Sequence, residues 1–102
     1  MSEKEVLFTP IKIGNRVAQN RIVINAMECC DSDEEGNPTE RTYERYRKLF
    51  EGKAGLIDLE AITVTYESRG RKTQLSIMPR NKEALTKFVR EMKSINKDTI
   101  FI

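Results

Sequence analysis

The side chains best suited to chemistry gather at the end of one apolar run. In "NRIVINAMECCDSDEEGNPTE" (20–40), the apolar residues 22–24 lead to Glu28 and to the adjacent thiols of Cys29 and Cys30, and four more carboxylates follow by residue 35. A metal-binding loop, a redox-active thiol pair and the mouth of a cofactor site each place soft or acidic side chains at the end of a buried strand. The residue types leave these three kinds of site open.

The acidic part of this stretch partly matches a calcium-binding loop. Asp31, Asp33, Glu35 and Gly36 occupy positions 1, 3, 5 and 6 of an EF-hand-like spacing, whose bidentate ligand is a glutamate at position 12. That position holds Thr42, and the pattern before the loop is typical of a strand, whereas an EF-hand loop follows a helix. The spacing therefore favours a solvated acidic loop over a calcium site.

Cys29 and Cys30 are the only cysteines, and the chain has no histidine. Two thiolates cannot complete the tetrahedral ligand set of zinc, and the side chains of neighbouring residues diverge too far to close an unstrained disulfide. We therefore expect no metal site and two free thiols, as in a reducing compartment. Either a thiol lies beside a cofactor or substrate, or the thiols are partly buried and carry no chemistry.

Two further groups of charged residues carry weaker signals. Asp58 and Glu60 are two positions apart in a stretch rich in β-branched residues, so both side chains leave the same face of a strand. The pair could share acid and base work, but the favoured interpretation gives Glu60 a structural role as a hydrogen-bond acceptor. Arg69, Arg71 and Lys72 form a basic cluster that is typical of a surface loop, with a phosphate or partner contact as the alternative.

The composition is that of an ordinary globular chain of at most one domain. Its 102 residues are 38% hydrophobic and 33% charged, close to the averages of soluble proteins. A net charge of +2 is too small to favour nucleic acid or an anionic membrane as a partner, and no apolar stretch approaches the ~18 residues of a membrane-spanning helix. The start, "MSEKEVLF", lacks the apolar segment of a signal peptide, so we expect a cytoplasmic protein.

Strand signals surround the chemistry-bearing residues on both sides. A hairpin is expected within residues 6–19, with Gly14 and Asn15 as its two-residue turn. Short apolar runs rich in β-branched residues are typical of buried strands. Such strands are predicted at 22–26, 54–64 and 99–102.

Two amphipathic helices separate those three strands. The first is expected to follow Thr39 as its N-cap and to end at Gly52 in a left-handed cap, and the second to follow Asn81. Apolar side chains recur at helical spacing in both, which predicts that these faces pack in the core. They are Tyr43, Tyr46, Leu49 and Phe50 in the first helix, and Ala84, Leu85, Phe88, Val89, Met92 and Ile95 in the second.

This alternation of strands and helices predicts an α/β fold with a parallel sheet and helices outside it. Each strand–helix unit takes roughly 35–40 residues, so about eight units would give the ~250 residues of a (β/α)8 barrel. We interpret residues 1–102 as a single incomplete domain, the N-terminal part of such a TIM barrel with about three of its eight strands. It would comprise a leading hairpin at 6–19 and βαβαβ units at 20–102.

Four stretches together resemble the old yellow enzyme family: "LFTPIKIGN", "NRIVINAM", "GNPTERTYERYRKLFEGKAGLIDLEAITV" and "RGRKTQLSI". These are FMN-dependent NADH:flavin oxidoreductases, which include ene-reductases and the 2,4-dienoyl-CoA reductase group. The resemblance runs from Leu7 to Ile102 in the family's order and spacing. It implies a (β/α)8 barrel closed at its bottom by an N-terminal hairpin, with the flavin at the C-terminal ends of the strands.

The resemblance also implies which residues border the flavin. Ala26 and Met27 match positions whose backbone borders the ring, Glu28 matches a position near the flavin C4 carbonyl, and Ala61 matches another position of the wall. Ala26 stands where proline is frequent, and Glu28 replaces a neutral threonine or cysteine. Asp58 is also unusual, because the family's strand is normally apolar or carries threonine there. The departures at Ala26 and Glu28 bear on the electronic tuning of the ring at that site.

The implied reaction moves hydride from NAD(P)H through FMN to an activated C=C bond of a small-molecule substrate. The resemblance places the family's substrate-anchoring and phosphate-binding residues beyond Ile102, so we expect no catalytic residue within this chain and no activity from it alone. The alternative is a non-catalytic, truncated α/β module that acts, if at all, through a partner or through self-association.

Overall fold

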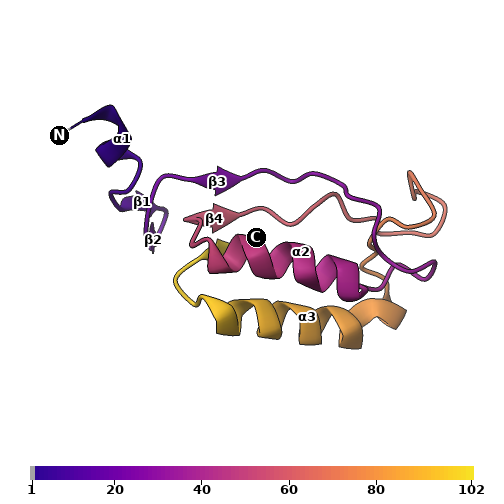
Figure 1. Cartoon of the computed structure of the whole chain (residues 1–102). Coiled ribbons are helices and arrows are strands. Elements are labelled where there is room, and N and C mark those ends of the chain that lie inside the picture. The colour runs from indigo at the N-terminus through magenta and orange to yellow at the C-terminus, as the bar shows by residue number, and fades with distance from the viewer. Residues whose placement is uncertain (1) are drawn as a thin grey trace.

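The fold is a small β-hairpin followed by a parallel sheet whose connections are helices (Figure 1). We describe residues 2–102 from a computed structural model. In chain order the elements are α1 (Glu3–Val6), β1 (Ile11–Ile13), β2 (Arg16–Ala18), β3 (Val23–Ile24), α2 (Glu40–Glu51), β4 (Leu56–Ile57), a 3₁₀ turn (Pro79–Asn81), α3 (Lys82–Ile95) and β5 (Ile100–Phe101). Within this part of the chain, no helix is long and apolar enough to cross a membrane.

The hairpin has the turn that the sequence predicts. Strands β1 and β2 pair antiparallel with Ile13 opposite Arg16, which leaves Gly14 and Asn15 as the two-residue turn. Gly14 has φ +62°, a left-handed conformation that glycine adopts at little cost. Pairing is confined to residues 11–18, inside the predicted range of 6–19, and the short helix α1 ends before it at Val6.

The three remaining strands form a parallel sheet in the order β3-β4-β5. Val23 pairs with Leu56, and Leu56 pairs with Ile100 on its other side. Helices α2 and α3 connect the strands and lie side by side on one face of the sheet (Figure 1). This is the βαβαβ arrangement that the alternating sequence pattern predicts, and both connections follow from the need of parallel strands for a crossover.

Regular strand β4 is shorter than the predicted strand at 54–64. The backbone N–H of Asp58 still donates to the Ile24 carbonyl across the sheet at 2.9 Å. The N–H of Glu60 instead donates to the hydroxyl of Tyr46 on α2, at 3.0 Å. A side chain from the covering helix therefore replaces the neighbouring strand as hydrogen-bond partner, and this ends the regular ladder.

The hydrophobic core lies between the sheet and helices α2 and α3. Phe88 meets Tyr46 edge-on with ring centroids 5.2 Å apart, and Phe101 of β5 meets Phe50 edge-on at 5.0 Å. Such aromatic pairs contribute packing beyond the area that they bury. The predicted apolar faces of both helices are confirmed, and the buried cluster comprises Tyr46, Phe50, Ala54, Ile57, Phe88 and Met92.

The two ends of α2 differ in how well the sequence predicts them. Thr39 is the N-cap, as expected, and its N–H donates to the Thr42 hydroxyl at 3.1 Å. The left-handed cap predicted at Gly52 is wrong: Gly52 has φ −72°, and the next residue, Lys53, has φ +61°. The amide side chain of Asn20 donates to the Lys53 carbonyl at 2.7 Å, and this tertiary contact holds the bend one residue later.

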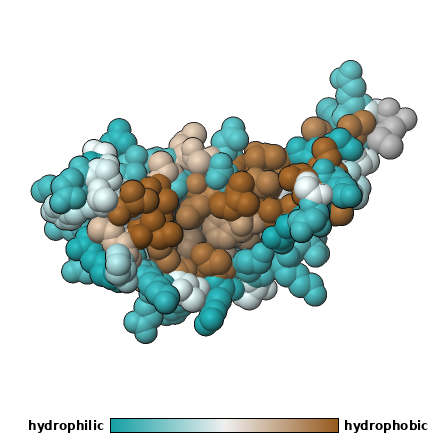
Figure 2. Space-filling model, turned by 180° about the vertical axis from the view of Figure 1, so that it is seen from behind, coloured by the Kyte–Doolittle hydropathy of each residue, from teal (hydrophilic) through white to brown (hydrophobic). Residues whose placement is uncertain are grey.

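One side of the molecule is apolar and open to solvent (Figure 2). The accessible surface is 6900 Å², whereas a folded monomer of this mass exposes about 5900 Å². Large exposed side chains on or next to the parallel strands include Val23, Met27 and Ile102, which are 51%, 72% and 65% exposed. An apolar area of this kind marks a surface that another protein layer can cover.

We expect the 102-residue chain to self-associate through this apolar side. Light scattering should give a mass above 11.8 kDa at high micromolar concentration. Ile102→Lys should lower the mass because it places a charge at the open edge of the sheet. Val64→Lys is the matched control, since Val64 is equally exposed (67%) but lies in a loop. A monodisperse wild-type monomer would contradict this expectation.

A second prediction concerns the start of α2. The Thr39 hydroxyl donates to the Asp31 carbonyl, so Thr39→Ala removes both a cap residue and a tether to the preceding loop. It should lower the free energy of unfolding by about 1 kcal/mol in urea denaturation. Thr86→Ala is the control, because the Thr86 hydroxyl is exposed and bonds only the Lys82 carbonyl of its own helix. Equal losses in the two variants would show that Thr39 has no special role.

Candidate functional site

The predicted wall residues lie where two parallel strands end. Ala26 and Met27 follow β3 and Ala61 follows β4, and all three are exposed. Because β3 and β4 are paired and parallel, their carboxyl ends meet at the same edge of the sheet. The Cys29 N–H donates to the Glu60 carboxylate at 3.3 Å, which holds the two chain segments side by side beyond the regular strands.

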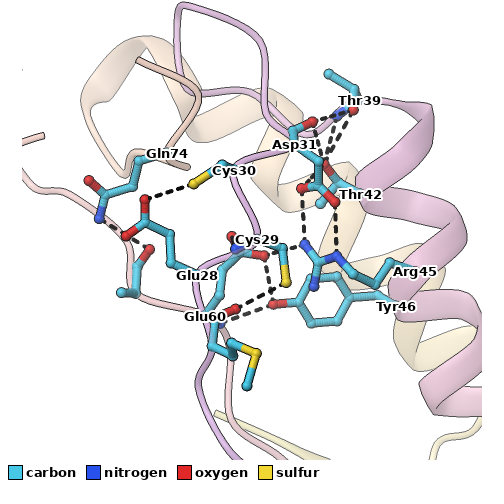
Figure 3. Close-up of polar contacts among 12 residues, drawn as sticks. Glu28, Cys29, Cys30, Asp31, Thr39, Thr42, Arg45, Tyr46, Glu60 and Gln74 are labelled. Carbon is cyan, nitrogen blue, oxygen red and sulfur yellow. Dashed lines mark hydrogen bonds and ion pairs between the residues drawn. The ribbon is translucent and has the colours of Figure 1, made fainter. Parts of the chain in front are cut away.

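Glu28 lies at the margin of this wall, and its carboxylate is turned toward Cys30 (Figure 3). The Cys30 thiol donates to it at 3.2 Å, and Arg71 forms an ion pair with it at 3.4 Å. The Glu28 side chain is only 18% exposed, while that of Arg71 is 66% exposed. The carboxylate is therefore paired with the basic loop rather than presented alone at the ends of the strands.

The same contacts change the chemistry of Cys30. The hydrogen bond to Glu28, together with burial and the negative charge of that carboxylate, raises the pKa of the Cys30 thiol, and Arg71 partly opposes this. A thiol with a raised pKa holds little thiolate at neutral pH and is a poor nucleophile. Both cysteines are free, and Cys29 is the more exposed.

A partly buried charge cluster joins α2 to the segments that follow β3 and β4 (Figure 3). The Glu60 carboxylate, with a side chain 1% exposed, accepts hydrogen bonds from Arg45 at 2.5 Å and from the Tyr46 hydroxyl at 3.1 Å. Arg45 also forms a two-pronged ion pair with Asp31, at 2.8 and 3.0 Å. The structural role predicted for Glu60 is confirmed, since a buried carboxylate needs such partners.

Burial and hydrogen bonds tune the groups around this cluster. Burial raises the pKa of Tyr46 to about 12, which keeps its hydroxyl a hydrogen-bond donor at every physiological pH. Burial also disfavours the charged form of Asp31, but the hydrogen bond and charge of Arg45, with a contribution from Thr42, outweigh it and lower the pKa of Asp31. At neutral pH the Tyr46 hydroxyl is thus protonated and the Asp31 carboxylate is ionised.

Of the remaining acidic residues considered above, Asp33 serves the local fold. Asp33 accepts backbone hydrogen bonds from Glu35 and Asn37, both at 2.9 Å, in a turn that closes on itself. Asp58 is half-buried, and among residues 2–102 no side-chain hydrogen bond or ion pair links it to Glu60. The structure therefore does not join Asp58 and Glu60 into an acid–base pair.

The basic cluster ties two loops together. The Arg69 guanidinium donates to the carbonyls of Glu34 and Lys72, at 2.9 and 3.0 Å, and lies over the Tyr66 ring at 4.1 Å. Arg71 reaches back to Glu28, as described above. These contacts join the loop after β3 to the loop after β4, which is a structural use of the cluster.

Arg45 is the important residue that the sequence pattern misses. Its position on the polar side of α2 suggests a solvated arginine, yet it is the cation of a partly buried network that includes the fully buried Glu60. The sequence feature that indicates such a partner is Glu60, because a carboxylate in an apolar strand needs a cationic or hydrogen-bonding group nearby. No feature of the sequence alone selects Arg45 from the basic residues of the helix.

The chain matches the model of the NADH:flavin oxidoreductase / NADH oxidase family over residues 6–102, and it belongs to that family. The old yellow enzyme from Pichia sp. AKU4542 superposes with a TM-score of 0.82 at 25% identity, over 94% of this chain and 25% of that one. The old yellow enzyme homologue from Zymomonas mobilis gives 0.80 at 26% identity, over 94% and 26%. No sequence among the curated proteins matches the chain.

The likeness extends to a larger relative. A 2-naphthoyl-CoA reductase superposes with a TM-score of 0.84 at 24% identity, over 95% of this chain and 15% of that one. The fold described above is therefore that of part of an old yellow enzyme (β/α)8 barrel, as the sequence predicts. The chain spans about a quarter of the length of the old yellow enzymes that it matches.

The contact between Glu28 and Cys30 gives a direct test by alkylation. Glu28→Gln removes the charge that favours the protonated thiol, so the pKa of Cys30 should fall and its reaction with iodoacetamide at about pH 8 should become faster. Cys29 in the same molecule serves as the internal reference, and fragment ions of the peptide that contains both cysteines distinguish the two sites in tandem mass spectrometry. An unchanged or slower Cys30 rate would contradict the hydrogen bond.

Proposed function

We propose that this chain forms one wall of the FMN site of an ene-reductase-type oxidoreductase, which moves hydride from NAD(P)H to an activated C=C bond of a small molecule. The observation that carries the proposal is the placement of Ala26, Met27 and Ala61 at the adjoining carboxyl ends of β3 and β4 in a chain of the NADH:flavin oxidoreductase family. Barrel enzymes place their chemistry at that edge. When bound, FMN supplies the ring that accepts and donates hydride.

The residues at the strand ends fit a flat, largely apolar ring. Ala26 and Ala61 add only methyl groups beside exposed backbone, and Met27 offers a thioether that is 72% exposed. Glu28 lies at the edge of this surface with Arg71 and the Cys30 thiol on its carboxylate. Arg71 offsets part of the negative charge of Glu28, so the ring meets less negative charge than a lone carboxylate would present. The family has a neutral donor at this position.

The phosphate of FMN has no comparable cradle in this part of the fold. The guanidinium groups of Arg69 and Arg71 are already engaged by backbone carbonyls and by Glu28. We infer that the 102-residue chain binds FMN weakly, is colourless after gel filtration and has no NADH oxidase activity. A cytoplasmic location remains a prediction from its N-terminal sequence.

Photolabelling with an azido derivative of FMN tests the wall directly, because it traps weak complexes. The label should enter peptides that contain Met27 and Ala61, and excess FMN should suppress it. Ala61→Glu should lower labelling at least about fivefold, since it places a charge against the ring. Thr86→Glu, on the exposed side of α3, should leave labelling unchanged. Label that spreads over the surface, or that FMN does not suppress, would overturn the proposal.

A further inference from the structure

We propose that Arg45 is a positioning residue for this wall, because it clamps the segment after β3 to the segment after β4. The inference rests on the proposed FMN site for its consequence, but the clamp itself is a property of this chain. Arg45 touches neither Met27 nor Ala61 through any hydrogen bond or ion pair among residues 2–102. It acts through the two carboxylates of Asp31 and Glu60.

The clamp begins with the geometry of the Arg45 guanidinium. Its Nε donates to one oxygen of Asp31 at 2.8 Å and its Nη2 to the other at 3.0 Å. The same Nη2 donates to Glu60 Oε1 at 2.5 Å. A planar, forked donor can hold two carboxylates at a fixed separation, whereas the point charge of a lysine cannot match both directions.

Each carboxylate then holds one end of the segment after β3. Glu60 accepts the Cys29 N–H through its second oxygen, Oε2, at 3.3 Å. The Asp31 side chain accepts the Thr42 hydroxyl at 3.0 Å. The chain is therefore fixed at residues 29 and 31, two and four positions after Met27.

The residue between the two anchors has an uncommon conformation. Cys30 has φ +54°, in the left-handed region that residues with a Cβ atom rarely occupy. Such a conformation persists when surrounding contacts determine it. It directs the Cys30 thiol onto the Glu28 carboxylate, so the same anchors also set the margin of the wall.

Glu60 also fixes the segment after β4, which contains the wall residue Ala61. It precedes Ala61 directly, and its carboxylate is almost fully buried. One arginine on α2 therefore sets the position of Met27 relative to Ala61 across two strands. A purely structural arginine would stabilise the whole fold, whereas this arrangement predicts a local effect on the segment 27–31.

Hydrogen–deuterium exchange distinguishes these roles in the 102-residue chain. Arg45→Met should speed exchange of the peptide containing Cys29 at least tenfold, while peptides of the core around Ile57 and Phe88 stay within twofold of wild type. Arg47→Met is the matched control, because Arg47 lies on the same helix and its one ion pair among residues 2–102 is an exposed 3.8 Å contact with Glu91. Its exchange should equal that of wild type at every peptide.

Arg45→Lys keeps the positive charge but removes the planar guanidinium that donates to both carboxylates. It therefore tests the clamp if Arg45→Met fails to fold. We expect at least threefold faster exchange at Cys29 in this variant. Wild-type exchange at Cys29 in either folded variant, or acceleration spread evenly over all peptides, would overturn the clamp.

Azido-FMN labelling then connects the clamp to the wall. In the Arg45 variants, label at the Met27 peptide should fall at least fivefold relative to Arg47→Met. If wild type takes up no specific label, the proposed FMN site fails while exchange still decides the clamp. If wild type is labelled and the Arg45 variants are labelled equally at the same peptides, the positioning role is overturned and the FMN site stands.

Discussion

A buried carboxylate needs hydrogen-bond donors or a cation close to it. The partners that Glu60 finds connect helix α2 to the chain segments after β3 and β4. The Glu60 side chain is 1% exposed and is held by Arg45, by the Tyr46 hydroxyl and by the Cys29 N–H. Each partner offsets the loss of hydration that burial imposes on the carboxylate, and each does so from a fixed direction. Glu60 therefore fixes helix α2 against the ends of β3 and β4 more specifically than apolar packing does.

The aromatic core and the charge network stabilise different parts of the sheet. Phe50, Phe88 and Met92 bury the middle of the sheet under two helices, and this packing is tolerant of small shifts along the strands. The hydrogen bonds of Glu60 and Asp31 have defined directions and act at the carboxyl end of the strands. Apolar packing thus holds the helices against the sheet. The polar network positions the chain segments at the carboxyl ends of the strands, where barrel enzymes bind their ligands.

The two loops at that edge are joined by oppositely charged residues. Arg71 from the second loop meets Glu28 of the first, and Arg69 donates to the Glu34 carbonyl. Farther from the strands, Ser76 donates to Asn81, whose amide also bonds the Glu35 carbonyl. The acidic and basic stretches, which look separate in the sequence, therefore form one surface beside the wall.

Local chemistry in the sequence is sufficient for the hairpin, the two long helices and the order of the strands. Gly14 and Asn15 specify a tight turn, and the spacing of Tyr46, Phe50, Phe88 and Met92 specifies two helices that cover one face of a sheet. Alternating strands and helices then require parallel pairing with crossovers on that face. The family motifs extend this to part of a flavoenzyme barrel, which the family match and the structural likeness confirm.

Only the tertiary structure decided which polar groups meet. Lys53 rather than Gly52 takes the left-handed bend because Asn20, distant in sequence, holds its carbonyl. Glu28 pairs with Arg71 and Glu60 with Arg45 because the parallel register brings the ends of β3 and β4 together beneath α2. Local periodicity predicts which face of a helix or strand a side chain occupies. The partner of a buried charge depends on distances that arise only when segments far apart in the chain pack together.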